Sequence, residues 1–188
     1  LEFLAPPEGL DWTDFTQYAD RLNGLGLSIN LAPLVAHGAL RIAAMGSENR
    51  PPGPEELNRM EETLEVLLAQ GAWGMSTGLI YPPGSFARTE ELIALAHVLA
   101  RQGALYASHI RADPNALWGG GNDEMLAAVQ EAIEVGRATG VRIHVSHIQC
   151  NYPAKSDDAD KLLAAIELAR RQGIDVTLDQ YPYLAGGQ

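Results

Sequence analysis

A unit made of a helix, a glycine and a short apolar strand repeats along this chain. Apolar residues at spacings of three and four predict helices over 54–70, 89–102, 123–139 and 157–172. After each helix comes a glycine suited to a left-handed C-cap, namely Gly71, Gly103, Gly140 and Gly173. A strand-like apolar run follows each glycine. Units of 32 to 37 residues build a parallel sheet covered by helices, because each crossover returns the next strand in the same direction.

An earlier unit extends this pattern toward the start of the chain. A helix over 12–23 leads through Gly24 and Gly26 into LSINLAPL, residues 27–34, which alternates like a strand. Five consecutive strands are too few to close a barrel. The predicted fold class is therefore α/β, with the chain forming an incomplete segment of a TIM-like barrel.

Composition excludes several classes of function. The net charge is −11 and no Lys/Arg cluster appears, which argues against nucleic acid and anionic membranes as partners. No apolar run approaches the roughly 20 residues that span a bilayer. The single cysteine, Cys150, excludes an internal disulfide framework. These features predict a soluble chain, which we place in the cytoplasm.

Two similar segments, YASHIR (106–111) and HVSHIQ (144–149), place histidines where neighbouring strands end. The carboxyl ends of parallel strands meet at one edge of a sheet, and in an α/β barrel that edge carries the active site. His109 and His147 are therefore predicted to lie within reach of a single metal ion. Neutral imidazole is a common zinc ligand, but a catalytic zinc site needs about three protein ligands.

The remaining candidates favour structural interpretations. His97 belongs to a helix face, and His37 is expected to make a structural hydrogen bond. His144, three residues before His147, is expected to face the helices on the opposite side of the strand. Cys150 is interpreted as an inert loop thiol rather than a metal ligand. By position, Asp179 at the end of the last strand is either a catalytic base or a partner that orients a histidine.

Several motifs resemble the N-acyl-D-amino-acid deacylases, the D-aminoacylase family of the amidohydrolase superfamily. In chain order they are WTDFTQYADRL, LVAHGALR, GMSTGLIYPPG, TEELIALA, LYASHIR, VSHI and DQYPYLAGG. The resemblance implies a (β/α)8 barrel that uses one or two zinc ions to hydrolyse the amide bond of a small N-acyl amino acid. It also implies that His109 and His147, on the fifth and sixth barrel strands, bind the metal.

The same resemblance suggests how substrate binds. Tyr181 matches a tyrosine that contacts the substrate carboxylate, and Ile80 and Tyr81 match positions that line a substrate pocket. Gln149 occupies the position of a common carboxylate-binding lysine, so a cation is missing there. Arg111 is predicted either to reach substrate or to pair with a neighbouring carboxylate.

The resemblance places residues 1–188 within one hydrolase barrel domain, from about its third strand to its seventh. Strands one, two and eight, with the remaining metal ligands and the catalytic aspartate, are expected outside this segment, so no catalytic residue is assigned within it. The segment alone is predicted to be inactive, and its open sheet edges favour a homo-oligomer. A cyclic-amide hydrolase or dipeptidase remains an alternative, as does a non-catalytic remnant or interaction module.

Overall fold

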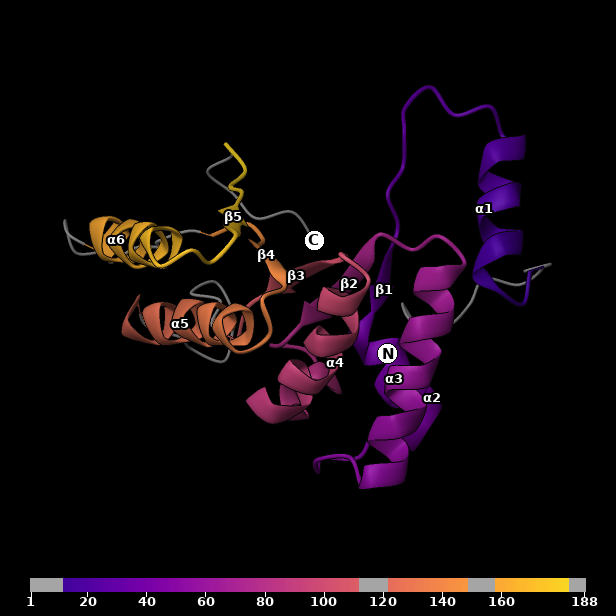
Figure 1. The fold of residues 1–188 in the computed structure, drawn as a ribbon, viewed down its shortest axis with the longest axis horizontal. Coiled ribbons are helices and arrows are strands. Elements are labelled where there is room, and N and C mark those ends of the chain that lie inside the picture. The colour runs from indigo at the N-terminus through magenta and orange to yellow at the C-terminus, as the bar shows by residue number, and fades with distance from the viewer. Residues whose placement is uncertain (1–11, 112–121, 149–157, 183–188) are drawn as a thin grey trace.

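The computed structural model describes residues 12–111, 122–148 and 158–182. Its centre is a five-stranded parallel sheet in which the strands lie in chain order (Figure 1). The strands are β1 (Leu34–Ala36), β2 (Gly74–Gly78), β3 (Leu105–His109), β4 (Arg142–Val145) and β5 (Val176–Leu178). This confirms the predicted parallel α/β architecture.

The helices follow the strands as the repeat predicts. They are α1 (Phe15–Gly24), α2 (His37–Met45), α3 (Pro54–Ala69), α4 (Thr89–Arg101), α5 (Asn122–Thr139) and α6 (Asp158–Arg171), with a 3-10 turn η2 (Gly84–Phe86) after β2. Helix α2 was not among the predicted helices. The four capping glycines all have positive φ, between 63° and 108°, as expected for left-handed C-caps.

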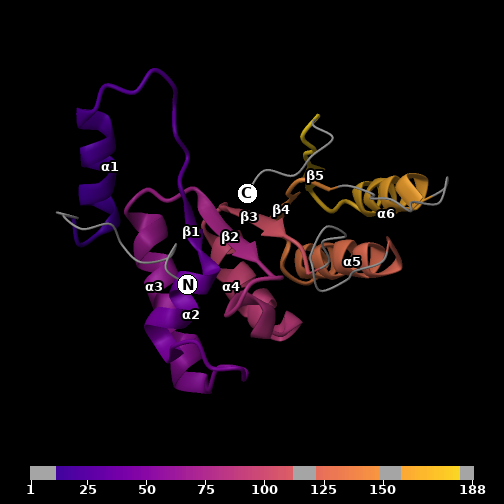
Figure 2. The ribbon, with the colours of Figure 1, turned by 180° about the vertical axis from the view of Figure 1, so that it is seen from behind.

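Consecutive helices from α2 to α6 pack against one another, and α3 to α6 are spread along the sheet from β1 to β5 (Figures 1 and 2). The strand residues turned toward these helices form a buried register row, which consists of Met75, Tyr106, Ile143 and Val176. They share one apolar cluster with the inward stripes of α3 and α4. Burial of these rows on one face supplies the main stabilisation of the sheet.

A close approach between α5 and β4 depends on Gly136. A Cβ atom at this position would lie only 2.2 Å from Cδ1 of Ile143 and 3.1 Å from Cγ2 of Ile174. A larger residue would therefore require the Ile143 side chain to move or the helix to shift away from the sheet.

The predicted first strand is misplaced. Residues 27–33 are not a strand, and β1 begins only at Leu34. The alternating apolar residues that suggested the strand are largely exposed, with Leu27 at 44% and Ile29 at 71%. Alternation alone does not make a strand, because backbone groups also need a neighbouring strand to bond. Within the described residues β1 pairs only with β2.

Among the described residues, no helix is both long and apolar enough to cross a membrane.

Candidate metal centre

The two predicted metal ligands lie together. His109 is the last residue of β3, and His147 follows β4, the next strand of the sheet. Their ring centroids are 4.4 Å apart and the rings meet edge to face, at 74°. This geometry agrees with the expectation that the two imidazoles lie side by side at the carboxyl edge of the sheet.

His147 reaches this position because the chain turns sharply after β4. Its φ is 39°, in the left-handed region that side chains other than glycine seldom adopt. The strand ends at Val145, so the alternation of faces that holds within β4 stops before His147. A sequence argument that extends the strand through His147 therefore assigns the wrong relation between His144 and His147.

The prediction that His144 faces the helices is wrong. His144 is the register partner of Ala107, and Ala107 precedes His109 by two residues on β3. Register partners and residues two apart share one face of a sheet, so His144 and His109 lie on the same face. We call this the inner face. It is the side opposite the buried Met75–Tyr106–Ile143 row.

The His144 ring contacts one residue of β5 and one residue that follows β5. Its Nδ1 lies 2.9 Å from Oγ1 of Thr177, and its Nε2 lies 3.0 Å from Oδ2 of Asp179. Because a carboxylate can only accept, Nε2–H of His144 is the donor in the contact with Asp179, while Nδ1 forms the contact with the Thr177 hydroxyl.

Asp179 joins both histidines of this segment. Its second oxygen, Oδ1, accepts a hydrogen bond from the backbone N–H of His147. Partial burial raises the pKa of the Asp179 carboxyl group, but the hydrogen bonds from His147 and His144 outweigh this and hold the pKa below its ordinary value. Asp179 is therefore a carboxylate at neutral pH. It contacts the ring of His144 and the backbone of His147, and its role in orienting a metal-binding histidine stays a prediction.

The loop after β2 contributes an aromatic neighbour. The rings of Tyr81 and His109 are 5.3 Å apart between centroids, and Tyr81 remains 53% exposed. Ile80, beside it, is half-buried. A Cβ at Gly78 would lie 3.2 Å from the Tyr81 ring, so this glycine leaves room for the ring to fold back toward the sheet.

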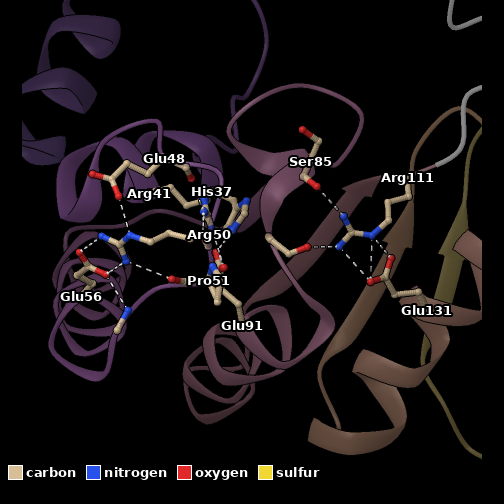
Figure 3. Close-up of polar contacts among 12 residues, drawn as sticks. His37, Arg41, Glu48, Arg50, Pro51, Glu56, Ser85, Glu91, Arg111 and Glu131 are labelled. Atoms are coloured by element: carbon tan, nitrogen blue, oxygen red, sulfur yellow. Dashed lines mark hydrogen bonds and ion pairs between the residues drawn. The ribbon is translucent and has the colours of Figure 1, made fainter. Parts of the chain in front are cut away.

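Of the two roles considered for Arg111, the structure shows the pair with a carboxylate (Figure 3). Its Nε donates to Glu131 on α5 at 2.9 Å, and its NH2 group donates to the carbonyl of Ala87 at 2.7 Å. A weaker bond of 3.3 Å reaches the carbonyl of Ser85. Arg111 thus fastens the 79–87 loop to α5, and these contacts favour a positioning role over direct contact with substrate.

A second histidine–carboxylate pair lies between α2 and α4. Nε2 of His37 is 2.8 Å from Oε1 of Glu91, and Arg41 donates to the other carboxylate oxygen (Figure 3). This confirms the structural hydrogen bond expected of His37. Burial raises the pKa of Glu91, but the bonds from His37 and Arg41 outweigh it and lower the pKa overall.

Sequence reasoning missed Glu91 and Arg41. The available signal was the i,i+4 spacing of His37 and Arg41, which places two polar side chains on one face of an otherwise apolar helix. Both side chains are completely buried. Within the described part of the chain, Nδ1 of His37 and Nε of Arg41 have no hydrogen-bond partner. The cluster therefore leaves two buried nitrogens without a partner while both oxygens of its carboxylate are bonded.

The remaining candidates are placed as follows. Tyr181 is half-buried, two residues beyond Asp179. Gln149 and Cys150 lie outside the described residues. Within the residues described, no group of three or more His, Cys, Asp or Glu side chains is arranged to hold a metal ion. His109 and His147 supply two imidazoles of the kind that zinc accepts, which fits part of a zinc site.

The chain was compared with known proteins. No family model matches it. An N-acyl-D-glutamate deacylase from Alcaligenes xylosoxydans xylosoxydans is 42% identical over 172 residues, which cover 92% of this chain and 34% of the relative. A D-aminoacylase from the same organism is 34% identical over 195 residues, covering 99% and 38%.

A solved structure agrees with these relatives. The N-acyl-D-glutamate deacylase of Bordetella bronchiseptica, complexed with zinc and a phosphonate that mimics the tetrahedral intermediate, superposes with a TM-score of 0.83. It is 39% identical and covers 94% of this chain and 35% of that one. The chain thus spans about a third of the length of the relatives it matches.

The parallel sheet and its single layer of helices are thus a segment of an amidohydrolase barrel. Within that class, the chain belongs to the N-acyl-D-amino-acid deacylase family, of which it represents a partial segment.

Proposed function

We propose that the protein containing this chain hydrolyses the amide bond of N-acyl-D-amino acids in a metal-dependent reaction. The observation that carries the proposal is the pairing of His109 and His147, 4.4 Å apart at the ends of adjacent strands, in a chain homologous to deacylases over more than nine-tenths of its length. The residues form part of one barrel domain, and the substrate is a small molecule.

The proposed metal is zinc, held in part by the imidazoles of His109 and His147. When bound, zinc supplies Lewis acidity toward an amide carbonyl and makes hydroxide accessible near neutral pH. Two imidazoles leave a tetrahedral ion short of protein ligands. We propose that the other ligands and the catalytic acid–base group come from outside the described residues.

This chain's own residues then position the metal ligands and shape the substrate site. We propose that Asp179 orients the His147 segment through its backbone N–H, and that Tyr81 and Ile80 form an apolar wall beside His109. Tyr181 is proposed to contact the substrate carboxylate. Gln149 is proposed to face the same carboxylate without a charge.

The test is to purify the full-length gene product and measure two quantities. Zinc content is determined after exhaustive dialysis, and hydrolysis is followed with N-acetyl-D-glutamate, its L-enantiomer, a six-membered cyclic amide and a dipeptide. We expect stoichiometric zinc and a preference for the N-acyl-D substrate. Preference for the cyclic amide or dipeptide would assign a different amidohydrolase activity, and absence of both zinc and turnover would make the protein a non-catalytic relative.

Single substitutions then assign the ligands. His109→Ala and His147→Ala should each lower zinc content and abolish turnover, because each removes one imidazole from the first coordination sphere. His97→Ala, on the exposed face of α4, is the matched control and should change neither quantity. Zinc retained at full stoichiometry in both variants would refute the assignment.

The substrate proposal has its own variant. Gln149→Lys adds a cation, and a charge-assisted bond contributes about 1.5–3 kcal/mol, so KM for substrates with a free carboxylate should fall about tenfold or more. An unchanged KM would show that residue 149 does not contact the carboxylate.

A further inference from the structure

His147 owes its place beside His109 to an unusual backbone conformation. Within the described residues it is the one residue other than glycine with a positive φ, 39°. In such a conformation the side chain leaves the direction that strand alternation would give it. A residue held this way persists only where surrounding contacts determine it.

Three successive backbone N–H groups of this turn are bonded to β3 or to Asp179, the residue that follows β5. The N–H of Ser146 donates to the carbonyl of Ser108 at 2.9 Å, and that of Ile148 donates to the carbonyl of Asp179 at 2.9 Å. Between them, the N–H of His147 donates to Oδ1 of Asp179. The central bond is therefore the one that depends on a side chain.

The Asp179 side chain is 60% exposed, and its residue follows the end of β5, so neither burial nor strand pairing fixes it. It therefore needs a second contact to stay in this position. His144 supplies that contact, with Nε2 at 3.0 Å from Oδ2. The His144 ring is itself held at its other nitrogen by Thr177, at 2.9 Å. Thr177 also donates to the carbonyl of Ile143 at 3.1 Å, so the threonine hydroxyl is anchored to the sheet.

The inner face leaves room for the His144 ring. Its register row consists of Ser76, Ala107, His144 and Thr177, and the two members on β2 and β3 are small. Ala107 therefore lies beside His144 where a larger side chain would compete for the same space. The row places the His144 ring on the face that carries His109, but the two ring nitrogens contact Thr177 of β5 and Asp179 just beyond it.

We propose that His144 is a positioning residue: acting through Asp179, it holds the His147 backbone in the left-handed conformation that brings the His147 ring against His109. This inference rests on the proposed metal site, and it assigns a supporting role to a third histidine beside the two proposed ligands. His144 is not itself a ligand. Thr177, Asp179 and His144 form one chain of contacts that ends at the His147 N–H.

The test uses the full-length protein and two readouts. Zinc dissociation constants are measured by chelator competition, and crystal structures are determined without metal. Outer partners of metal ligands commonly contribute 10- to 100-fold in affinity, so His144→Leu should weaken zinc binding in that range. In its metal-free structure the His147 ring should move away from His109.

Conservative replacement should rescue the site. A glutamine amide can donate to Asp179 from nearly the position of Nε2, so His144→Gln should weaken zinc binding by less than about tenfold. Asp179→Asn keeps an acceptor for the His147 N–H and should behave likewise, whereas Asp179→Ala should resemble His144→Leu. His97→Leu, an exposed histidine on α4, is the control and should leave affinity unchanged.

A double variant separates an indirect role from a direct one. If His144 acts through Asp179, adding His144→Leu to Asp179→Ala should weaken zinc binding no further. A full additional loss in the double variant would show that His144 contacts the metal, and would overturn the proposal. An unchanged His147 conformation in metal-free His144→Leu would overturn it as well.

The two levels of inference fail separately. A wild-type protein that binds no zinc refutes the metal site, while the metal-free crystal structures still test whether His144 and Asp179 set the conformation of His147. Thr177→Val gives a second variant of the same contact chain if His144→Leu does not fold. It should shift the His144 ring and move His147 in the same direction by less, and an unmoved His147 would count against the proposal.

Discussion

Two histidine–carboxylate pairs in this molecule have nearly equal geometry and different surroundings. His37 and Glu91 meet at 2.8 Å with side chains 0% and 2% exposed, whereas His144 and Asp179 meet at 3.0 Å with side chains 24% and 60% exposed. The first pair lies between α2 and α4 (Figure 3), and the second lies on the inner face of the sheet. Distance alone therefore does not say what a pair does.

Burial decides the energetic consequence. A carboxylate inside the protein has lost its water, so removing its partners or the carboxylate itself leaves an uncompensated buried charge. An exposed pair competes with water and contributes little to folding. The Glu91 cluster accordingly serves the fold, and the Asp179 network is free to serve the position of His147.

The largest effect should come from breaking the buried cluster. Glu91→Ala leaves the completely buried guanidinium of Arg41 without its carboxylate, and loss of one partner of a buried pair costs about 3–5 kcal/mol. The free energy of unfolding, from urea denaturation, should fall by this amount. Glu90→Ala, the exposed neighbour on the same helix, is the control and should change it by about 0.5 kcal/mol or less. A cost below about 1 kcal/mol for Glu91→Ala would remove the contrast between the two pairs.

The pH dependence of stability should carry the signature of Glu91. Its pKa is lowered in the folded protein, so its contribution is present above the unfolded value of about 4.3 and is lost as pH falls through the folded value. The free energy of unfolding should therefore decline as the pH falls from the unfolded pKa of Glu91 toward its lower folded pKa. Glu91→Gln should reduce this slope, measured as the free energy of unfolding against pH. An identical slope in the variant would mean that the carboxyl group titrates alike in both states.

The exposed pair should matter less for folding than for metal binding. Asp179→Ala should lower the free energy of unfolding by about 1 kcal/mol or less, because solvent screens a contact of this exposure. Urea denaturation of the metal-free protein measures it. A loss comparable to that of Glu91→Ala would show that the inner-face network also holds the fold together.

The smallest effect sets the baseline for both pairs. Arg101 and Glu65 meet at 3.3 Å between α4 and α3 with side chains 58% and 48% exposed. Glu65→Ala should change the free energy of unfolding by about 0.5 kcal/mol or less, and salt should reduce the difference further. A larger value would indicate that this pair fastens the two helices.

Much of the fold could be predicted because it follows from local patterns. Glycines 71, 103, 140 and 173 mark the helix ends at the expected places and adopt the expected positive φ. The apolar stripes of the helices have a period that one segment reveals by itself. Residues 27–33 show where this reasoning stops, because a strand also needs a partner strand, which no single segment contains.

The candidate site also has features that local patterns predict and features that depend on distant segments. The repeated Ser-His-Ile motif on neighbouring strands predicted that His109 and His147 would meet, since parallel strands end at one edge. The face occupied by His144 could not be predicted, because β4 ends at Val145 and the alternation of faces stops with it. The contact between His37 and Glu91 was also out of reach, since Glu91 lies 54 residues further along the chain.

The sequence by itself determined the repeated alternation of helix and strand from α3 onward, the direction of the strands and the edge at which the histidines gather, because these depend on residue spacing and on the fixed hand of the crossover. The tertiary structure alone decided which contact each carboxylate makes and how much water it keeps. Glu91 and Asp179 are both carboxylates beside a histidine, but the interaction energy of each charge depends on how far water screens it. Solvent exposure arises only when distant segments pack, so it separates the structural pair from the pair that positions His147.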